Sequence, residues 1–400
     1  EHNVCRLEGA DWNDGLDMAP RRGESAAFSA FYAWNLGRLA ELAERLEARG
    51  HRRLRVFEEL LMLLDRLPGQ EPVRYATWTA KQRRLQQYFE TVARDLSGRQ
   101  AGVRPAELAA DLRAKQADLT ERLRTQEWLR VGDARWFNGY YDDQGRRVEG
   151  SVGGRVRMTL TGQVFTLMGG IATEEQVDEV IRSVTRHLRD PISGGIRLNT
   201  DFGAIQPHLG RAFAFAYGEK ENGAVFSHMA VMYAFALYAR RRAQAGRAVW
   251  HALYRLATDQ PAARIFPSLP EYFNGQHRGM YGYLTGSASW LIYLLLTQVY
   301  GVRGQLGDLC LDPQLTREDF GGREELAVRC HLAGRPLIVR YHNPQRLDAG
   351  AYRVAGVQAS SQPLPIHRQP PRGAVIARSA LERLPKGAPS TLDVTLAPAD

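Results

Sequence analysis

The chain has 400 residues, of which 44% are hydrophobic and 24% are charged, so it carries enough apolar side chains for more than one hydrophobic core. Its formal net charge is +9. The arginines nevertheless alternate with acidic residues along predicted helix faces, as in 41–49 and 111–124, which indicates solvated helix surfaces and argues against a nucleic-acid-binding module.

The spacing of the cysteines and the length of the longest apolar run indicate where in the cell the protein is expected. Three cysteines stand far apart in the chain, which argues against a disulfide framework and against a CxxC-type metal site. The longest strongly apolar run, 290–296, is far shorter than the ~20 residues that a membrane span needs. We therefore expect a cytoplasmic protein. Because the chain begins Glu1-His2-Asn3 without a methionine or a leader, we also expect a fragment of a longer protein.

Helical periodicity dominates the first three hundred residues. It predicts a long helix over 25–50, followed by helices over 51–67, 76–96 and 105–129. Gly50 is a stop signal for the first of these. Its expected buried face is a stripe of large apolar residues: Phe31, Leu36, Leu39, Leu42 and Leu46.

The stretch 132–156 interrupts this pattern, because it is rich in glycine and aromatic residues and predicts a long functional loop or hairpin. The spacing of Thr173 and Gln176 predicts a capping box at the start of a helix. Helical pattern then resumes at 158, 226–245, 248–257 and 287–300. Paired helices with long loops between them suggest an α/α toroid.

After Gly301 the chain changes to short alternating runs such as 326–332, 337–341 and 352–357, which predict a β domain. The tail from Gln358 is rich in proline and predicts an extended end of the chain. We therefore expect two domains, 1–300 and 301–400, and a fold that is mainly α with a C-terminal β domain.

Three glycine-rich segments precede helices and carry candidate functional residues. In 9–17, Trp12 can stack on a sugar face while a nearby carboxyl group protonates a glycosidic oxygen; the alternative is a turn held by Asx hydrogen bonds. In 218–228, His228 opens an apolar helix, where anions bind well; the alternative is a partly buried histidine beside a surface charge cluster.

The third segment, 281–290, places small hydroxyl residues and Gly286 before an apolar helix. Thr285 and the exposed backbone N–H groups can all point at one oxyanion, which is typical of a phosphate site, although an ordinary helix cap is the alternative. In an α/α toroid such loops gather at one end of the barrel. Together they suit glycosyl transfer to phosphate, because phosphate arrives as an anion and needs no general base.

The three segments resemble glycoside hydrolase family 94, which contains cellobiose, chitobiose and oligoglucan phosphorylases. The resemblance implies that 1–300 is the C-terminal portion of an (α/α)6 catalytic barrel and that 301–400 is a jelly-roll-like β-sandwich. It also implies the site: Asp14 as the catalytic general acid, Trp12 and Glu221 at the sugar, and His228, Thr285 and Gly286 at the phosphate.

The function that the resemblance implies is inverting phosphorolysis of a β-linked gluco-oligosaccharide to α-glucose 1-phosphate, with no metal or organic cofactor. The expected partners are the oligosaccharide and phosphate, with a homodimer as a candidate assembly, no nucleic acid and no membrane span. The stretches 136–149 and 264–273 look more like the β-1,2-glucan branch of the family. Family members begin with a large β-sandwich and earlier barrel helices, so we expect a C-terminal piece.

Three alternatives stay open at this point. A hydrolase on a related barrel needs a second carboxylate as base, and the candidates for it are Asp11, Asp17, Glu219 and Glu221. The chain also fits the phosphorylase-like domain of a cyclic β-1,2-glucan synthase. The third alternative is a non-catalytic fragment that binds glucan.

Overall fold

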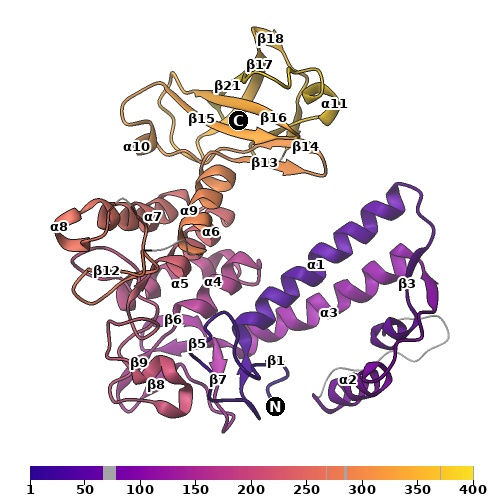
Figure 1. The fold of residues 1–400 in the computed structure, drawn as a ribbon, viewed down its shortest axis with the longest axis vertical. Helices are drawn as coiled ribbons and strands as arrows, with labels where there is room; N and C mark the ends of the chain where they lie inside the picture. The colour runs from indigo at the N-terminus through magenta and orange to yellow at the C-terminus, as the bar shows by residue number, and fades with distance from the viewer. Residues whose placement is uncertain (66–77, 267, 283–285, 370, 400) are drawn as a thin grey trace. The chain divides into compact units, whose positions relative to one another are not determined.

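The computed structural model describes residues 1–65, 78–266, 268–282, 286–369 and 371–399 (Figure 1). The chain forms two compact units, each of which gathers two stretches of sequence. Unit 1 is Glu1–Leu188 with Leu198–Gly223, and unit 2 is Arg189–Arg197 with Ala224–Asp400.

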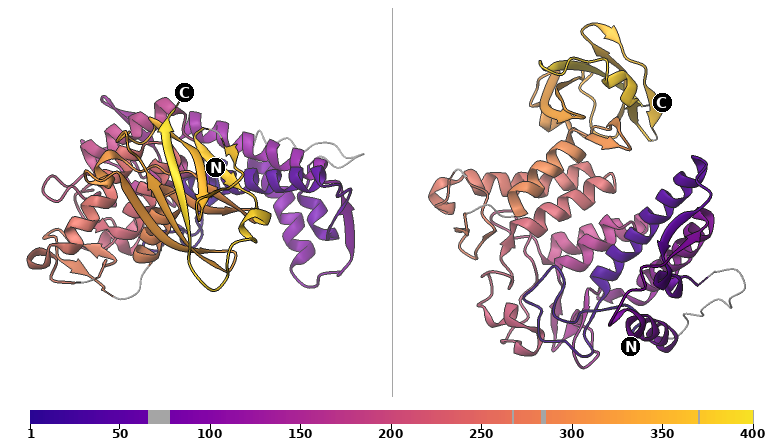
Figure 2. Two further views of the ribbon diagram at one scale, coloured as in Figure 1. Left: turned by 90° about the horizontal axis from the view of Figure 1, so that it is seen from above. Right: turned by 45° about the vertical axis from the view of Figure 1, so that its right-hand side comes forward.

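Two long helices of unit 1, α1 (Ala26–Ala48) and α3 (Pro105–Gln126), pack side by side (Figure 2). As predicted, α1 begins directly after Ser25, whose Oγ accepts the N–H of Phe28 at 2.9 Å. Such a cap satisfies one of the N–H groups that a helix start leaves without an intrahelical partner.

The face of α1 that is buried differs from the predicted one. Ala40 and Ala43 pack on Ala109 of α3, whereas Leu39 and Leu42 are 53% and 47% exposed. Small residues let the helix axes come close, and a Cβ at Gly37 would lie only 2.4 Å from Nε2 of Gln116. The predicted stripe is therefore wrong at Leu39 and Leu42, whereas Phe31, Leu36 and Leu46 are half-buried. The packing of α1 on α3 selects the alanine face.

The predicted helix over 51–67 is also wrong. Here β3 (Leu54–Phe57) pairs antiparallel with β4 (Gln100–Val103), and a short 3-10 turn, Glu58–Leu63, follows. Leu54 and Val56 are half-buried on one face of β3 and alternate with exposed residues, which is the period of a strand. In so short an apolar run the helix and strand periods are hard to separate. The helix α2 (Trp78–Val92) comes next, inside the predicted range.

The stretch after α3 contains hairpins, as predicted for 132–156, and two further helices. The capping box of Thr173 and Gln176 at the start of α5 is confirmed. The strands pair as β5 (Trp128–Val131) with β6 (Ala134–Phe137), β8 (Gly150–Val152) with β9 (Arg155–Arg157), and β1 (Cys5–Arg6) with β2 (Glu24–Ser25) and β7 (Tyr140–Tyr141). The helices are α4 (Leu160–Met168) and α5 (Glu174–His187).

Unit 2 begins with helices and a small sheet. Most residues of α6 are buried. Among the described residues, no helix combines the length and the apolar character that crossing a membrane requires. The helices are α6 (Ser227–Ala239), α7 (Ala243–Thr258), α8 (Gln260–Ala263) and α9 (Gly286–Leu294), and the strands are β10 (Val225–Phe226), β11 (Tyr272–Phe273) and β12 (Gly279–Met280).

The C-terminal part of unit 2 consists mostly of strands in two sheets (Figure 1). The four-stranded sheet has the order β13 (Val302–Gln305), β14 (Asp308–Leu311), β20 (Gly373–Ile376), β19 (His367–Gln369). The five-stranded sheet has the order β15 (Glu325–Leu332), β16 (Arg335–His342), β21 (Ser390–Pro398), β17 (Tyr352–Ala359), β18 (Gln362–Pro363). Two single-turn helices, α10 (Arg317–Phe320) and α11 (Arg378–Leu381), lie between strands in the sequence.

The tail that we expected to be an extended end supplies the central strand of this larger sheet. β21 pairs in parallel with β16 and antiparallel with β17. Leu392, Val394 and Leu396 are buried and alternate with more exposed residues. The alternation is visible in the sequence, but the density of proline before it favoured an irregular chain.

Candidate active site

The acid loop, defined as residues 9–17, lies between β1 and β2 in unit 1. Its path is set by side chains that bond the backbone two residues further on. Oδ1 of Asp11 accepts the N–H of Asn13 at 3.0 Å, and Oδ1 of Asn13 accepts the N–H of Gly15 at 3.1 Å. The Asx hydrogen bonds of the alternative interpretation are therefore present. They turn the chain so that Trp12 is half-buried and Asp14 is exposed.

Asp14 lies beside a cation that the sequence analysis did not identify. The Asp14 side chain is 73% exposed, and its Oδ2 accepts a hydrogen bond from Nη2 of Arg211 at 2.8 Å. Arg211 also donates to Asp17, from Nη1 at 3.1 Å and from its backbone N–H at 3.1 Å. No signal in the sequence joins residues 197 positions apart, so only the fold reveals this contact.

The turn that carries Glu221 is fastened from within unit 1. The N–H of Gly218 donates to the carbonyl of Asn222 at 2.7 Å, which closes the turn. Asn199 then donates from Nδ2 to Asn222 at 3.1 Å and accepts the N–H of Gly223 at 2.9 Å. Glu221 itself is half-buried in this turn. Asn199 therefore fixes the turn on which Glu221 is carried, a role that spacing alone did not indicate.

His228 and Gly286 come together in unit 2. His228 is in the first turn of α6 and Gly286 is the first residue of α9. A Cβ added to Gly286 would lie 2.6 Å from Cε1 of His228, so the glycine backbone lies directly against the ring. Burial lowers the pKa of His228, which favours the uncharged form of its imidazole. Thr285, the third predicted phosphate ligand, lies outside the described residues.

The predicted site residues thus fall in both units. Trp12, Asp14 and Glu221 belong to unit 1, whereas His228 and Gly286 belong to unit 2. Within unit 1 the acid loop contacts the segment after Gly210, and within unit 2 the imidazole contacts the start of α9. The meeting of all the predicted residues in one active site stays a prediction.

A buried carboxylate outside these motifs has an unusual set of donors. Glu149 accepts hydrogen bonds from Nε1 of Trp136 at 3.1 Å and from the N–H of Gly139 at 2.7 Å. Thr159 donates to it twice, from its N–H at 2.9 Å and from its hydroxyl at 2.7 Å. Burial raises the pKa of Glu149 to about 7 against the opposing effect of these donors. Glu149 therefore holds the start of β7 and the start of α4 together.

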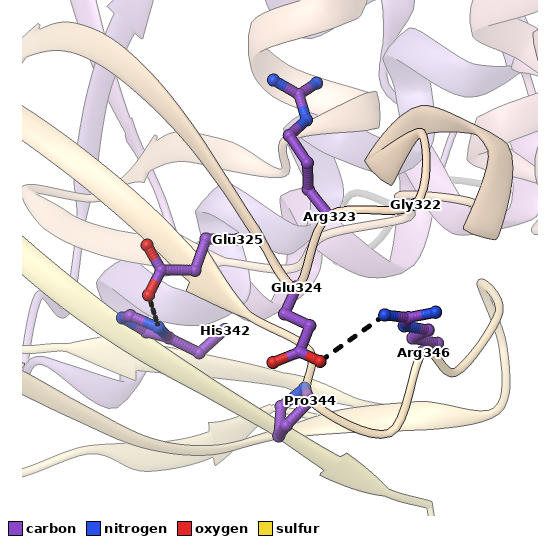
Figure 3. A pocket seen from close by; sticks show the side chains of 7 residues that line it. All are labelled: Gly322, Arg323, Glu324, Glu325, His342, Pro344 and Arg346. Atoms are coloured by element: carbon purple, nitrogen blue, oxygen red, sulfur yellow. Dashed lines mark ion pairs between the residues drawn. The ribbon is translucent and has the colours of Figure 1, made fainter.

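A hollow of about 780 Å³ opens on the β-rich part of unit 2 (Figure 3). Two ion pairs lie among its lining residues: Glu325 with His342 at 3.0 Å, and Glu324 with Arg346 at 3.7 Å. None of the predicted site residues lines it, so we do not include it in the candidate active site. It is lined by Gly322, Arg323, Glu324, Glu325, His342, Pro344 and Arg346.

The chain is similar to a glycosyl hydrolase family model and to two proteins that are named as phosphorylases. Residues 98–255 match the model of the Glycosyl hydrolase 94 superfamily, catalytic domain. The chain is 24% identical over 234 residues to a 3-O-β-D-glucopyranosyl-β-D-glucuronide phosphorylase of Paenibacillus borealis, covering 56% of this chain and 29% of that protein. It is 21% identical over 362 residues to an N,N′-diacetylchitobiose phosphorylase of Vibrio proteolyticus, covering 88% and 37%.

A third relative has a different name. The chain is 27% identical over 203 residues to the cyclic β-(1,2)-glucan synthase NdvB of Rhizobium meliloti, covering 48% of this chain and 7% of that protein. In all three comparisons the chain spans less than two fifths of the relative's length.

Proposed function

We infer that this chain, which is similar to part of a glycoside hydrolase family 94 protein, carries the general acid and part of the phosphate site of an inverting glycoside phosphorylase. The match of residues 98–255 to the catalytic-domain model is the observation that carries the reaction type. The helical part of the chain is proposed to belong to an (α/α)6 barrel, and the two C-terminal sheets of the chain are proposed to form a β-sandwich.

In the proposed reaction, a phosphate oxygen attacks the anomeric carbon of a β-glucoside while the glycosidic bond breaks. Asp14, in its protonated form, gives its proton to the leaving oxygen, and the products are α-glucose 1-phosphate and the shortened sugar. The exposure of Asp14 supports this role, because an acid catalyst has to reach the substrate. Trp12 and Glu221 are proposed to contact the sugar.

Phosphate is proposed to bind to His228, Thr285 and Gly286. The contact between the imidazole and the Gly286 backbone supports this, because a neutral ring can donate one hydrogen bond to an anion next to the N–H groups of a helix start. Phosphate brings its own negative charge, so the reaction needs no metal or organic cofactor.

The leaving sugar is the open part of the proposal. We propose a β-linked gluco-oligosaccharide, with β-1,2-glucan as the first linkage to examine. The similarity to a cyclic β-(1,2)-glucan synthase favours the alternative that this chain is a phosphorylase-like domain of such a protein.

The test is release of glucose 1-phosphate by the full-length protein, with and without phosphate. The substrates are β-1,2-gluco-oligosaccharides and 3-O-β-D-glucopyranosyl-β-D-glucuronide, both of which carry a glucosyl group that can be transferred to phosphate. We expect phosphate-dependent release from at least one of them, and a loss of about 1000-fold in kcat for Asp14→Asn, since a positioned acid contributes ~10²–10⁴ to the rate.

Asp17→Asn is the matched control, because Asp17 is in the same loop and pairs with the same arginine at 3.1 Å. We expect it to keep most of the activity. Release of free glucose without phosphate would identify a hydrolase instead. Equal activity of Asp14→Asn and the unmodified protein would remove Asp14 from the mechanism.

A further inference from the structure

The base of the acid loop is attached to unit 1 through Asp11, the first carboxylate of the loop. Asp11 is half-buried, and both of its oxygens accept hydrogen bonds from side chains outside the loop. Oδ2 accepts the hydroxyl of Ser25 at 2.7 Å, and Oδ1 accepts the hydroxyl of Tyr140 at 3.0 Å. Oδ1 also accepts the N–H of Asn13, as described above. One carboxylate therefore joins the loop to two other parts of the chain.

The two outside donors are neighbours across a sheet. Ser25 of β2 and Tyr140 of β7 are paired residues of adjacent antiparallel strands. Side chains of such a pair lie on the same face, which explains how residues from distant parts of the sequence reach one carboxylate. Ser25 is at the same time the cap of α1, since its Oγ accepts the N–H of Phe28.

The buried hydroxyl groups of Ser25 and Tyr140 restrict the loop more than the exposed ion pair at its tip does. Tyr140 and Ser25 are both about 1% exposed, so their hydroxyls have little access to water as an alternative partner. The Asp14–Arg211 pair joins side chains that are 73% and 56% exposed, and such pairs contribute little to rigidity. The position of Asp14 therefore depends on the base of the loop.

We propose that Asp11 is a positioning residue for the acid: it fastens the loop to the β2–β7 pair so that Asp14 is held at the leaving oxygen. This inference rests on the proposed function for its catalytic part. Asp11 does not touch the reacting atoms in this scheme. It acts through Asp14, by limiting the positions that the turn at Asn13 and Gly15 allows.

The chain offers a matched pair of variants. Tyr140→Phe removes the hydroxyl that donates to Asp11, and Tyr141→Phe removes its neighbour's hydroxyl, which donates to the buried Glu127 at 2.9 Å. Both tyrosines are at most 2% exposed, so each variant deletes a buried hydroxyl that donates to a carboxylate; Tyr141→Phe also removes the acceptor of Arg147 Nε at 3.3 Å, which makes it the more demanding control. Asp11→Asn and Glu127→Gln are a second matched pair.

The activity readout compares two leaving groups in the full-length protein. An oligosaccharide leaves as a basic alkoxide and needs the proton of Asp14, whereas fluoride leaves from β-glucosyl fluoride with the bonding electron pair and needs no proton. For Tyr140→Phe we expect kcat to fall about tenfold with the oligosaccharide and less than about twofold with the fluoride. For Tyr141→Phe we expect less than about a twofold change with either substrate.

A second readout does not depend on activity. Amide hydrogen exchange of residues 9–17 reports the hydrogen bonds that fix the turn, and we expect faster exchange in Tyr140→Phe and Asp11→Asn but not in the two control variants. Equal losses on both leaving groups, or equal effects of Tyr140→Phe and Tyr141→Phe, would overturn the positioning role. If the full-length protein releases no glucose 1-phosphate from any substrate, the proposed function fails. Independently of activity, unchanged amide exchange of residues 9–17 in Tyr140→Phe and Asp11→Asn would overturn the proposal that Asp11 fastens the loop.

Discussion

The acid loop and the start of α9 are held in opposite ways. The loop is fixed by hydrogen bonds that converge on Asp11 from within the loop and from two other parts of unit 1, Ser25 and Tyr140. The start of α9 is fixed by close packing, with the backbone of Gly286 against the ring of His228. A region held by hydrogen bonds is sensitive to protonation and to loss of a single polar atom, whereas a packed region is sensitive to added volume.

The largest effect on stability that we expect tests the region that is held by hydrogen bonds. Glu149 holds Gly139, the residue before Tyr140, and its pKa rises from 4.5 in the unfolded chain to about 7 in the folded protein. The folded state therefore binds the proton more tightly, and stability is fully present below pH 4.5 and is lost as the pH rises through 7. The loss is up to about 3 kcal/mol between about pH 4.5 and pH 8.

The measurement is the free energy of unfolding in urea at pH 5 and pH 8, for the unmodified protein and for Glu149→Gln. The amide side chain of the variant does not ionise, so the variant should lack this part of the pH dependence. The same change between pH 5 and pH 8 in both proteins would contradict the role of Glu149.

The next effect tests the packed region. In Gly286→Ala the new Cβ would lie 2.6 Å from Cε1 of His228, so the ring has to move. We expect the KM for phosphate to rise by about 30-fold, the equivalent of about 2 kcal/mol of binding. Phosphate kinetics of the full-length protein measure it.

Gly9→Ala is the corresponding change in the acid loop, and a Cβ at Gly9 would have nothing within 4 Å. We expect it to leave the KM for phosphate unchanged. Equal kinetics for Gly286→Ala and the unmodified protein would show that phosphate does not depend on this contact.

The smallest effect concerns the tip of the acid loop. Arg211→Ala removes ion pairs with Asp14 and Asp17 whose side chains are largely or partly exposed. We expect the unfolding free energy to change by no more than about 1 kcal/mol and the amide exchange of 9–17 to stay close to that of the unmodified protein. Exchange as fast as in Tyr140→Phe would mean that the tip, rather than Asp11, holds the loop.

Local signals predicted some elements well. Ser25 as the start of a helix and the capping box of Thr173 depend on residues within three positions, and both are present. The buried face of α1 was not predictable in the same way, because the choice between the alanine face and Leu39 and Leu42 is made by α3. The hydropathy pattern of one helix carries no information about the shape of the helix that packs on it.

In the candidate site, too, local motifs identified some residues and only the fold identified others. Motifs in the sequence identified Asp14, Glu221 and His228, and their catalytic roles stay predictions. The residues that contact the acid loop from elsewhere in the fold were not identified: Tyr140 is 129 positions from Asp11, and Arg211 is 197 positions from Asp14. Contacts between such distant positions arise from the topology of unit 1, for which one sequence carries no periodic signal.

The central place of β21 has a consequence for the order of events during synthesis. β16 and β17 flank β21 and are made before it, so each presents an unpaired edge until residues 390–398 have left the ribosome. The larger sheet therefore cannot close hairpin by hairpin in the order of synthesis, because β16 and β17 both need β21 as their partner. Until then, the exposed edges are where a nascent chain is most open to a chaperone or to mispairing with a neighbouring copy.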